Sequence, residues 1–411
     1  MALDVLAKTQ LPSAPQTTKA DVVIVGAGIV GVVLACSLAQ AGLEVALVET
    51  RPKTAGLENR RAYALTLLTG DILQQLGVWD QLVGQVTAFQ QIRLSEAAAG
   101  PVVRLQPSDL QRQSLGYVAE HRVVLQALYD RLDKLDTVHW CCPATVTAVD
   151  YKRDQAVVTV TTEAGDLQIA APLVVAADGM RSPLRQAAAI KTQGWSYWQS
   201  CISFTIQLEH SHQAIAHECF WPSGPFAILP LPSNRCQIVW TAPHAEAQAI
   251  AALPETEFIA TLQARLRGQF GAIQLETQPL VFPVRLMQSR HYSQPRLALI
   301  GDAAHCCHPV GGQGMNMGIR DAAALAQILT TAAQQSEDWG SLNVLRRYER
   351  WRRLENLAIL GFTDILTRTF SNQIWPLTLF RRWGLSLLNI CRPLRVLALR
   401  LMTGQLGRSP L

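Results

Sequence analysis

The chain has 411 residues, of which 49% are hydrophobic and 16% are charged, and this composition excludes a disordered chain and a small disulfide-stapled scaffold. The formal net charge is only +5, which is small for a nucleic-acid-binding protein, and we expect no nucleic-acid partner. The positive excess is concentrated after Glu355, where seven arginines stand against one acid.

The first residues and the cysteines bear on the compartment. Residues 1–19 lack the apolar core and the small-residue cleavage site of a secretory signal, and we expect them to form a flexible leader. The nine cysteines are odd in number and never have a C-x-x-C spacing, which is typical of reduced thiols rather than of a zinc site. These observations predict a cytoplasmic protein.

A glycine-rich segment near the N-terminus has two interpretations. Residues 22–43 carry no charge, and 22 residues are enough to cross a bilayer. However, Gly26, Gly28 and Gly31 spell G-A-G-I-V-G directly after a strand-like segment. A helical pattern and a second strand-like segment follow, and the latter ends at Glu49. This order favours a dinucleotide-binding βαβ unit, without identifying the dinucleotide.

Each residue of this motif has a physical reason. Gly26 permits the tight turn, Gly28 lets a pyrophosphate approach the backbone, and Gly31 lets helix and sheet pack closely. The helix N-terminus then directs the positive end of its dipole toward the phosphates. Glu49 can accept hydrogen bonds from a ribose diol.

Residues 145–185 predict a β-meander followed by a further strand. Three segments with strand composition, separated by turn-like residues, lie between positions 145 and 170. The apolar segment 173–177 reads as another strand and ends at Asp178 and Gly179. Taken alone, an Asp-Gly pair after a strand indicates only a turn.

Residues 296–329 combine an apolar strand that ends at Asp302, a glycine-rich loop and a helix. Such a loop places backbone N–H groups at a helix N-terminus, where they stabilise negative charge. His305 and His308 have a spacing that metal ligands can share on a helix. Pro309 and the glycines break a helix here, and no carboxylate or cysteine completes the set, so we expect no metal.

The three motifs, GAGIVG, AADGMRS and LIGDAAHCCHPVGGQGMN, resemble in this order the class A FAD-dependent aromatic monooxygenases of the p-hydroxybenzoate hydroxylase fold. Within that group the chain is most similar to the ubiquinone-biosynthesis hydroxylases of the 2-polyprenyl-6-methoxyphenol hydroxylase type. The resemblance covers the chain from about residue 21 to the C-terminus. It extends to RRAYAL (60–65), LGYVAEHRVVLQAL (115–128), WPSGPFAILPL (221–231) and FSNQIWPLTLFRRWGLSLLN (370–389).

The resemblance implies an α/β fold. A Rossmann-like FAD-binding domain of the glutathione-reductase type would be interleaved with a mostly β substrate domain and followed by a C-terminal helical region. The FAD-binding domain would comprise residues 20–190 and 286–340, with residues 85–112 contributing to the substrate domain. The substrate-binding sheet would comprise residues 191–285, and the basic amphipathic helical region residues 341–411.

The resemblance also assigns FAD contacts. Gly26, Gly28 and Gly31 would line the pyrophosphate, with Glu49 on the adenosine ribose and Arg51 beside it. The other matching positions are Arg61 near the pyrophosphate and the side where nicotinamide enters, Arg122 at the flavin, Asp178 in a motif that contacts FAD and NAD(P)H, Asp302 at the ribityl and pyrophosphate region, Pro309 over the reactive flavin edge, and Gly311, Gln313, Gly314, Met315 and Asn316 at the pyrimidine end. Asn59 departs from the Asp common in the family, which leaves the geometry of Arg61 open.

The implied reaction is ring hydroxylation of a polyprenylated phenol in isoprenoid quinone biosynthesis, of ubiquinone or plastoquinone type, by FAD and O2 through a flavin C4a-hydroperoxide. NAD(P)H or another electron donor would reduce the flavin. Phe226, Ile228 and Leu229 are the candidates for the apolar substrate pocket. No clear acid or base stands out, and Pro309 and His308 are the catalytic candidates.

Residues 374–401 mix large apolar side chains with five arginines, as interfacial helices near anionic lipids do. This pattern predicts peripheral association with a membrane surface, from which a polyprenylated phenol would reach the flavin. An amphipathic subdomain packed on the core explains the pattern as well and is compatible with it. Other enzymes of quinone biosynthesis are further expected partners.

Two other functions stay open. A flavin-dependent reductase of a prenyl lipid would share the FAD motifs, and O2 consumption coupled to the substrate distinguishes it from a hydroxylase. A non-catalytic flavin-binding member of a quinone-biosynthesis assembly would keep residues 26–49, although the intact loop 311–316 argues against it. The ring position and the length of the prenyl tail are not readable.

Overall fold

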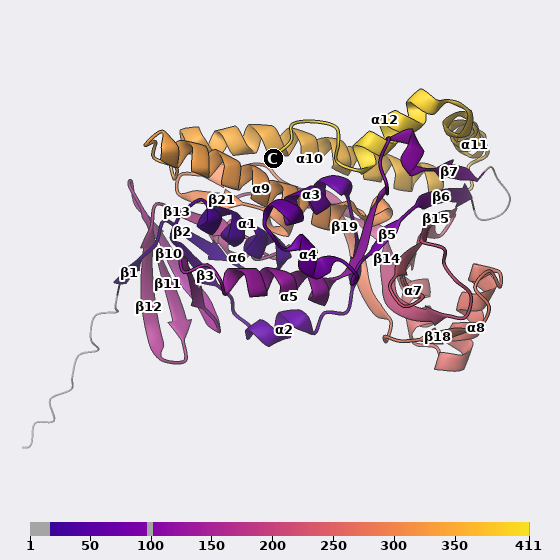
Figure 1. The fold of residues 1–411 in the computed structure, drawn as a ribbon, viewed down its shortest axis with the longest axis horizontal. Coiled ribbons are helices and arrows are strands. Elements are labelled where there is room, and N and C mark those ends of the chain that lie inside the picture. Colours follow the sequence, from indigo (N-terminus) through magenta and orange to yellow (C-terminus); the bar gives the residue numbers. More distant parts are fainter. Residues whose placement is uncertain (1–16, 97–101, 411) are drawn as a thin grey trace, which may run out of the picture.

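The computed structural model describes residues 17–96 and 102–410. These residues form four sheets, over which long C-terminal helices lie (Figure 1). Of the expected leader, residues 1–16 lie outside the described residues. Its last three residues form strand β1 (Thr17–Lys19), which pairs in parallel with β12 (Gly165–Ala171). The leader prediction is wrong for these three, because main-chain pairing holds them on a sheet edge.

The N-terminal motif forms the centre of a mostly parallel sheet. Its neighbouring strands are parallel except for one antiparallel pair, β20 with β21. Strands of such sheets are apolar throughout because both faces are covered. The order is β20 (Ser293–Gln294), β21 (Leu297–Leu299), β13 (Leu173–Ala176), β2 (Val22–Val25), β3 (Val45–Val48) and β9 (Val138–Cys141).

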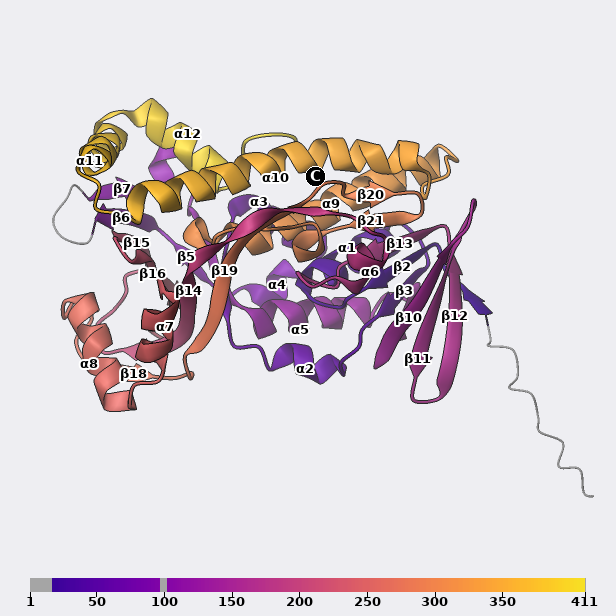
Figure 2. The same cartoon turned by 180° about the vertical axis from the view of Figure 1, so that it is seen from behind.

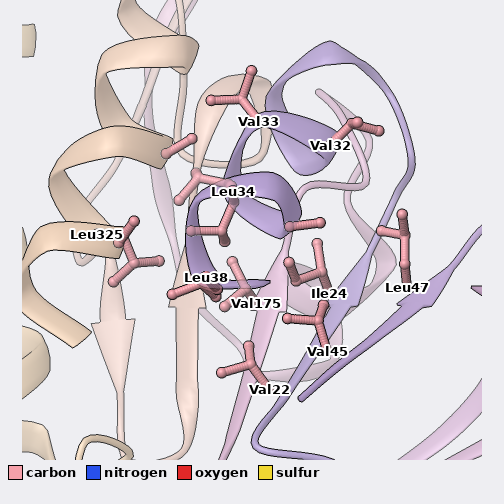
Figure 3. Packing of buried hydrophobic residues seen from close by; sticks show 14 of the residues in the cluster. Val22, Ile24, Val32, Val33, Leu34, Leu38, Val45, Leu47, Val175 and Leu325 are labelled. Carbon is pink, nitrogen blue, oxygen red and sulfur yellow. The ribbon is translucent and has the colours of Figure 1, made fainter. Parts of the chain in front are cut away.

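Helix α1 (Ile29–Gln40) follows the glycine turn and is buried on almost every side. It packs between the parallel sheet, α5 (His121–Leu132) and α9 (Gln313–Gln334), which explains why its apolar residues have no single face. Figure 3 shows this core, in which the labelled side chains are Val22, Ile24, Val32, Val33, Leu34, Leu38, Val45, Leu47, Val175 and Leu325.

The predicted β-meander is confirmed. Strands β10 (Ala144–Tyr151), β11 (Ala156–Thr162) and β12 pair antiparallel and contribute to the same core as the parallel sheet. A small antiparallel sheet has the order β4, β8, β5. Its strands and the short helices of this part of the chain are β4 (Ala62–Leu65), β8 (Gly116–Glu120), β5 (Thr87–Phe89), α2 (Lys53–Leu57), α3 (Leu67–Gln75), α4 (Trp79–Leu82) and α6 (Pro183–Ala187).

A large mixed sheet lies at the other end of the molecule (Figures 1 and 2). One of its faces packs against α7 (His244–Ala251) and α8 (Glu255–Leu266) around Trp240 and Phe258. The strand order is β22 (His305–Cys306), β19 (Leu280–Ser289), β14 (Thr192–Leu208), β17 (Arg235–Pro243), β16 (Gly224–Leu231), β15 (Ile215–Trp221), β6 (Gln91–Glu96) and β7 (Val103–Leu105), with β18 (Ile273–Leu275) on β14.

The C-terminal helices connect the two ends. Helix α10 (Leu342–Phe370) runs along the molecule from the parallel sheet to the mixed sheet, and α11 (Trp375–Ile390) and α12 (Arg392–Met402) follow near β6 and β7 (Figure 2). Short 3-10 turns complete the path at η1 (Pro107–Asp109), η2 (Gly301–Ala303) and η3 (Val310–Gly312). Within 17–96 and 102–410, no helix is both long enough and apolar enough to cross a membrane.

The predicted α/β class with a helical C-terminal region is confirmed. The division of the chain into domain segments stays a prediction. Two observations bear on its boundaries: β6 and β7 join the mixed sheet, as residues 85–112 were expected to do, and β19 continues past residue 285 to Ser289.

Candidate active site

Two cavities meet where α1 begins. The outer cavity, of about 780 Å³, opens beside Glu49, and the inner cavity, of about 790 Å³, lies between the start of α9 and the mixed sheet. Gly28, Arg61 and His121 stand in the walls of both. Each cavity has the volume of a cofactor or ligand site, and together they offer an elongated space for a dinucleotide.

The three glycines at the start of α1 differ in their surroundings. A Cβ added at Gly26 would lie 2.4 Å from the carbonyl oxygen of Ala177, and one added at Gly31 would lie 2.0 Å from that of Gly26, so both positions require the close packing of turn, helix and sheet. A Cβ added at Gly28 would meet nothing within 4 Å. Gly28 also caps α1 without a side-chain hydrogen bond, so the first N–H groups of the helix remain available to a phosphate.

Glu49 closes the outer cavity at the end of β3. Its two carboxylate oxygens accept hydrogen bonds from the N–H groups of Ala27 (2.9 Å) and Arg51 (3.0 Å), which hold the carboxylate beside the glycine turn. Tyr129 donates to the carbonyl oxygen of Ala27 at 3.0 Å and lines the same cavity. The Arg51 side chain is mostly exposed at the rim. These positions fit a ribose and its adenine, with Glu49 as the acceptor for the diol.

Arg61 stands where the two cavities join. The N–H of Arg61 donates to Oδ1 of Asn59 at 3.0 Å, so Asn59 fixes the turn before β4. The guanidinium of Arg61 lies 4.6 Å from the centre of the Phe282 ring. The geometry that Asn59 left open is therefore defined in the structure: Arg61 is held between turn and sheet and faces both cavities.

Four of the predicted FAD contacts are not in the walls of either cavity: Gly26, Arg122, Asp178 and Asn316. Arg122 is half exposed and donates to Glu120 at 3.1 Å, whereas the preceding residue, His121, lines both cavities. One carboxylate oxygen of Asp178 accepts the N–H of Leu184 at 3.3 Å and the other is buried without a partner. Burial raises the pKa of Asp178. We infer that Asp178 holds the turn after β13, whose neighbours Ala177 and Gly179 line the inner cavity.

The loop that leads into α9, residues 308–314, is named here the glycine loop. Gly311 and Gly312 have φ angles of +71° and +61°, which glycine adopts without strain, and Gly312 caps α9 without a side-chain hydrogen bond. Pro309, Gly311, Gly314 and Met315 line the inner cavity together with Asp302, whose pKa is raised by burial. A helix N-terminus at the far end of the inner cavity suits the electron-rich pyrimidine edge of a flavin.

Gln313 and Asn316 hold the glycine loop in place. The Gln313 amide donates to the carbonyl oxygens of Gly311 (3.0 Å) and Met402 (3.1 Å). Gln313 also lines the inner cavity. Asn316 is buried and does not line it. Its side chain accepts from the N–H of Thr66 at 2.8 Å and donates to Ala64 at 2.8 Å, so it clamps α9 to β4.

The structure corrects the prediction that His308 is catalytic. Its ring is fully buried, packs edge-on against Tyr197 with centroids 5.1 Å apart, and accepts the N–H of Val310 at 3.1 Å. Burial lowers the pKa of His308 to about 3. Because the ring lies behind the glycine loop and not in a cavity wall, it supports the loop rather than meeting a substrate. Pro309 lines the inner cavity, and its place over the reactive flavin edge stays a prediction.

Of the three residues predicted for the substrate pocket, only Leu229 lines the inner cavity, and its contact with a substrate stays a prediction. Phe226 and Ile228 point away from the inner cavity into the core under α7 and α8, whereas Ala227 and Leu229 face the cavity. Successive side chains of a strand point to opposite faces, and β16 therefore cannot present all three predicted residues to one pocket.

Helices α10 to α12 close the inner cavity at the end away from α1. Phe362, Phe370 and Leu385 line it, and Phe380 and Leu387 line it while remaining 71% and 52% exposed. Several tail arginines are used in ion pairs. Arg381 and Arg382 bind Glu96 of β6, and Arg395 binds Asp109 of η1, which docks α11 and α12 on the mixed sheet.

Sequence reasoning missed His121 and Glu218. Burial lowers the pKa of His121 to about 4, so the ring at the junction of the cavities is neutral at pH 7. Glu218 lies on β15 and faces the inner cavity between Ala216 and Phe220. The available signal for Glu218 was a carboxylate inside a mostly apolar strand. For His121 it was the family match at Arg122, the next residue in the chain.

The glycine turn before α1, the acid that ends β3 and the second helix N-terminus at α9 line two adjoining cavities, and the two helix N-termini suit the negative charges of FAD. Fold and site therefore define a flavin-binding oxidoreductase of the α/β class. A family model described as "FAD binding domain" matches residues 19–362, and the chain belongs to this family of FAD-dependent monooxygenases, which use NAD(P)H and O2. The predicted family resemblance is thereby confirmed.

Individual relatives support the same family membership. The chain is 38% identical over 394 residues to ubiquinone hydroxylase UbiL of Rhodospirillum rubrum, covering 95% of this chain and 91% of the relative. It is 33% identical over 373 residues to 3-demethoxyubiquinol 3-hydroxylase of Escherichia coli, covering 89% and 93%. In fold it is similar to p-nitrophenol 4-monooxygenase PnpA of Pseudomonas putida, with a TM-score of 0.80, 20% identity, and coverage of 96% and 99%.

Proposed function

We propose that this protein is an FAD-dependent monooxygenase that hydroxylates the ring of a polyprenylated phenol in isoprenoid quinone biosynthesis. The observation that carries the proposal is the inner cavity, which runs from the glycine loop to the exposed side chains of α11 and is lined mostly by apolar groups. Such a shape suits a ligand with a ring at one end and a long hydrocarbon tail. The names of the relatives above support the same substrate class.

Residues of the two cavities would have different roles in binding FAD and the substrate. The N-terminus of α1 would receive the pyrophosphate, Glu49 the ribose, and the N–H groups of Gly314 and Met315 the pyrimidine edge of the ring system. Bound FAD supplies electron transfer from NAD(P)H and activation of O2. Pro309 and the apolar side chains of β15 and β16 keep water from the reacting end of the substrate.

We propose further that the protein takes its substrate from a membrane surface. Trp375, Trp383 and Ile390 of α11 are 73%, 77% and 83% exposed, beside Phe380, which also lines the cavity. Arg392 and Arg400 of α12 are exposed and add positive charge. Large apolar side chains next to basic ones are typical of contact with anionic lipids. A polyprenyl tail would then pass between Phe380 and Leu387 without crossing water. Other quinone-biosynthesis enzymes are the further partners that this substrate class implies.

The function is tested on the purified protein by its absorbance spectrum, by anaerobic reduction with NAD(P)H, and by readmission of O2 with and without a prenylated phenol. Bound flavin and a hydroxylated product detected by mass spectrometry are expected. Flavin that produces only peroxide with every phenol would contradict the substrate class. A reduced prenyl double bond without O2 uptake would indicate a reductase, and protein without flavin would indicate a non-catalytic role.

The membrane proposal is tested by sedimentation with vesicles of phosphatidylcholine alone or mixed with phosphatidylglycerol. The double variant Trp375→Ser/Trp383→Ser should bind the mixed vesicles several-fold less than the wild type, because it loses two interfacial anchors. Trp198→Ser is the matched control, since Trp198 is also exposed but lies on β14. Equal binding of all three proteins would contradict this role of α11.

A further inference from the structure

Among the described residues, the sheet wall of the inner cavity has one carboxylate, that of Glu218. Glu218 occupies the middle of β15, where it pairs with Ala227 of β16 and Leu94 of β6. Apart from His217, the residues of these strands that line the cavity around it are apolar: Ile92, Leu94, Ala216, Phe220, Ala227 and Leu229. An isolated carboxylate on an apolar surface is costly to fold, which indicates a use other than stability.

Glu218 also touches the FAD side of the cavity. The backbone N–H of Gly311 in the glycine loop lies near this carboxylate and favours its charged form. The strand that forms the substrate wall and the loop assigned to the flavin thus meet at this side chain. A phenol that lies between them would place its hydroxyl within reach of the same carboxylate.

We propose that Glu218 is the catalytic base that accepts the proton of the phenolic hydroxyl of the substrate. The proposal rests on the proposed function and adds the acid–base residue that sequence reasoning did not find. In the step, the O–H bond of the phenol breaks, its electron pair stays on the phenolic oxygen, and the proton forms an O–H bond with the Glu218 carboxylate. The increased electron density on the ring favours attack by an electrophilic oxygen, and the proton returns to the phenolic oxygen when the product forms.

The protonation behaviour of Glu218 agrees with this role. Burial raises the pKa of Glu218 to about 7, and the nearby backbone N–H of Gly311 acts in the opposite direction. A base with a pKa near the working pH is efficient, because it is largely deprotonated and still able to bind the proton. A free phenol, with a pKa of about 10, needs such help at neutral pH.

Other titratable groups face the cavity from different sides. Arg61, His121 and Asp302 belong to the FAD side, where the two cavities join or the glycine loop begins. Arg381 of α11 is paired with Glu96. Cys306 and Cys307 also line the cavity, and burial raises the pKa of both thiols well above neutral pH. His217, the neighbour of Glu218 on β15, also lines the cavity, but burial lowers its pKa to about 4, so it binds a proton only well below neutral pH. Among the described residues of the substrate wall, Glu218 is therefore the group that can accept a proton at neutral pH.

The first test measures equilibrium binding to the oxidised holoenzyme without turnover. At pH 8, 2-farnesylphenol should bind about tenfold more tightly than its methyl ether, because only the phenol donates a hydrogen bond to a carboxylate. Glu218→Leu should abolish this preference, and Glu218→Gln should keep part of it, since the amide oxygen still accepts. Glu163→Gln, in the exposed turn before β12, is the control and should behave like the wild type.

The second test is the pH profile of product formation. In the wild type, kcat/KM should fall as the pH drops through about 7, the pKa of Glu218. Glu218→Gln should reduce product formation about 100-fold at pH 8 and remove this acidic limb, with flavin content unchanged. A Glu218→Gln protein that keeps the wild-type rate and the acidic limb would overturn the proposal while leaving the proposed function intact. A wild type that binds flavin but hydroxylates no prenylated phenol would overturn both.

Discussion

The inner cavity has one wall made of α1, the glycine loop and α9, and an opposite wall made of the mixed sheet and α10 to α12. The first wall acts mainly through its backbone: glycines that allow close approach and N–H groups at two helix N-termini. The second acts through side chains from strands and helices far apart in the chain. The comparison teaches that a cofactor held by its phosphates and ring edge needs short local motifs, whereas a hydrocarbon ligand needs a surface assembled by the whole fold.

The largest effect is expected in the first wall, from two substitutions three residues apart. Gly28→Ala should abolish flavin retention while the protein without flavin melts at the wild-type temperature, because an added Cβ meets no protein atom within 4 Å but occupies the path of the pyrophosphate. Gly31→Ala should lower both the flavin content and the melting temperature, because its Cβ would lie 2.0 Å from a carbonyl oxygen. Flavin absorbance per protein and thermal melting measure the two effects. A Gly28→Ala protein that retains its full flavin content would contradict the assignment of the pyrophosphate site to the N-terminus of α1.

Phe226 and Leu229 lie on opposite faces of β16 in the second wall, so substitutions at the two positions should have different effects. Phe226→Ala should reduce the free energy of unfolding by about 3–5 kcal/mol and leave the KM for a prenylated phenol unchanged, because Phe226 packs under α7 and α8. Leu229→Ala should cost less than about 2 kcal/mol and raise the KM several-fold, because Leu229 is only partly buried and faces the cavity. Urea unfolding and steady-state kinetics compare them. The opposite pattern would show that the strand faces are reversed.

The smallest effect concerns His308, which supports the glycine loop of the first wall from outside the cavity. The pKa of His308 is lowered to about 3 by burial, whereas the unfolded chain binds the proton near 6.5. Its contribution to stability is therefore complete above pH 6.5 and is lost as the pH falls toward 3, by about 1.4 kcal/mol per pH unit.

His308→Asn should remove this part of the pH dependence, because Asn can still accept the N–H of Val310 but does not bind a proton. Unfolding in urea between pH 4 and pH 8 measures the slope. Burial also lowers the pKa values of His121 and His217 to about 4, so the variant should keep a pH dependence of stability with a smaller slope than that of the wild type. His210→Asn, on an exposed residue, is the control. Identical slopes in His308→Asn and the wild type would contradict the buried neutral state of His308.

Sequence reasoning succeeded where neighbours in the chain are neighbours in space. Gly26, Gly28, Gly31 and Glu49 lie where the motif predicted, since a βαβ unit brings them together within a short stretch. It failed by one residue at Arg122, where His121 points inward, because the helix direction at that point depends on the packing of α5. It failed at Phe226 and Ile228 because composition does not tell which face of a strand is the cavity.

By itself, the sequence determined the βαβ unit, the glycine loop and the family, because these depend on backbone geometry encoded over a few adjacent residues. Only the tertiary structure decided that Glu96 of β6 and Arg381 of α11, 285 residues apart, form a buried ion pair, and that Glu218 of β15 lies beside Gly311 of the glycine loop. Such pairs depend on strand order and side-chain direction. These are settled when distant segments bury a common apolar surface, and no local spacing records them.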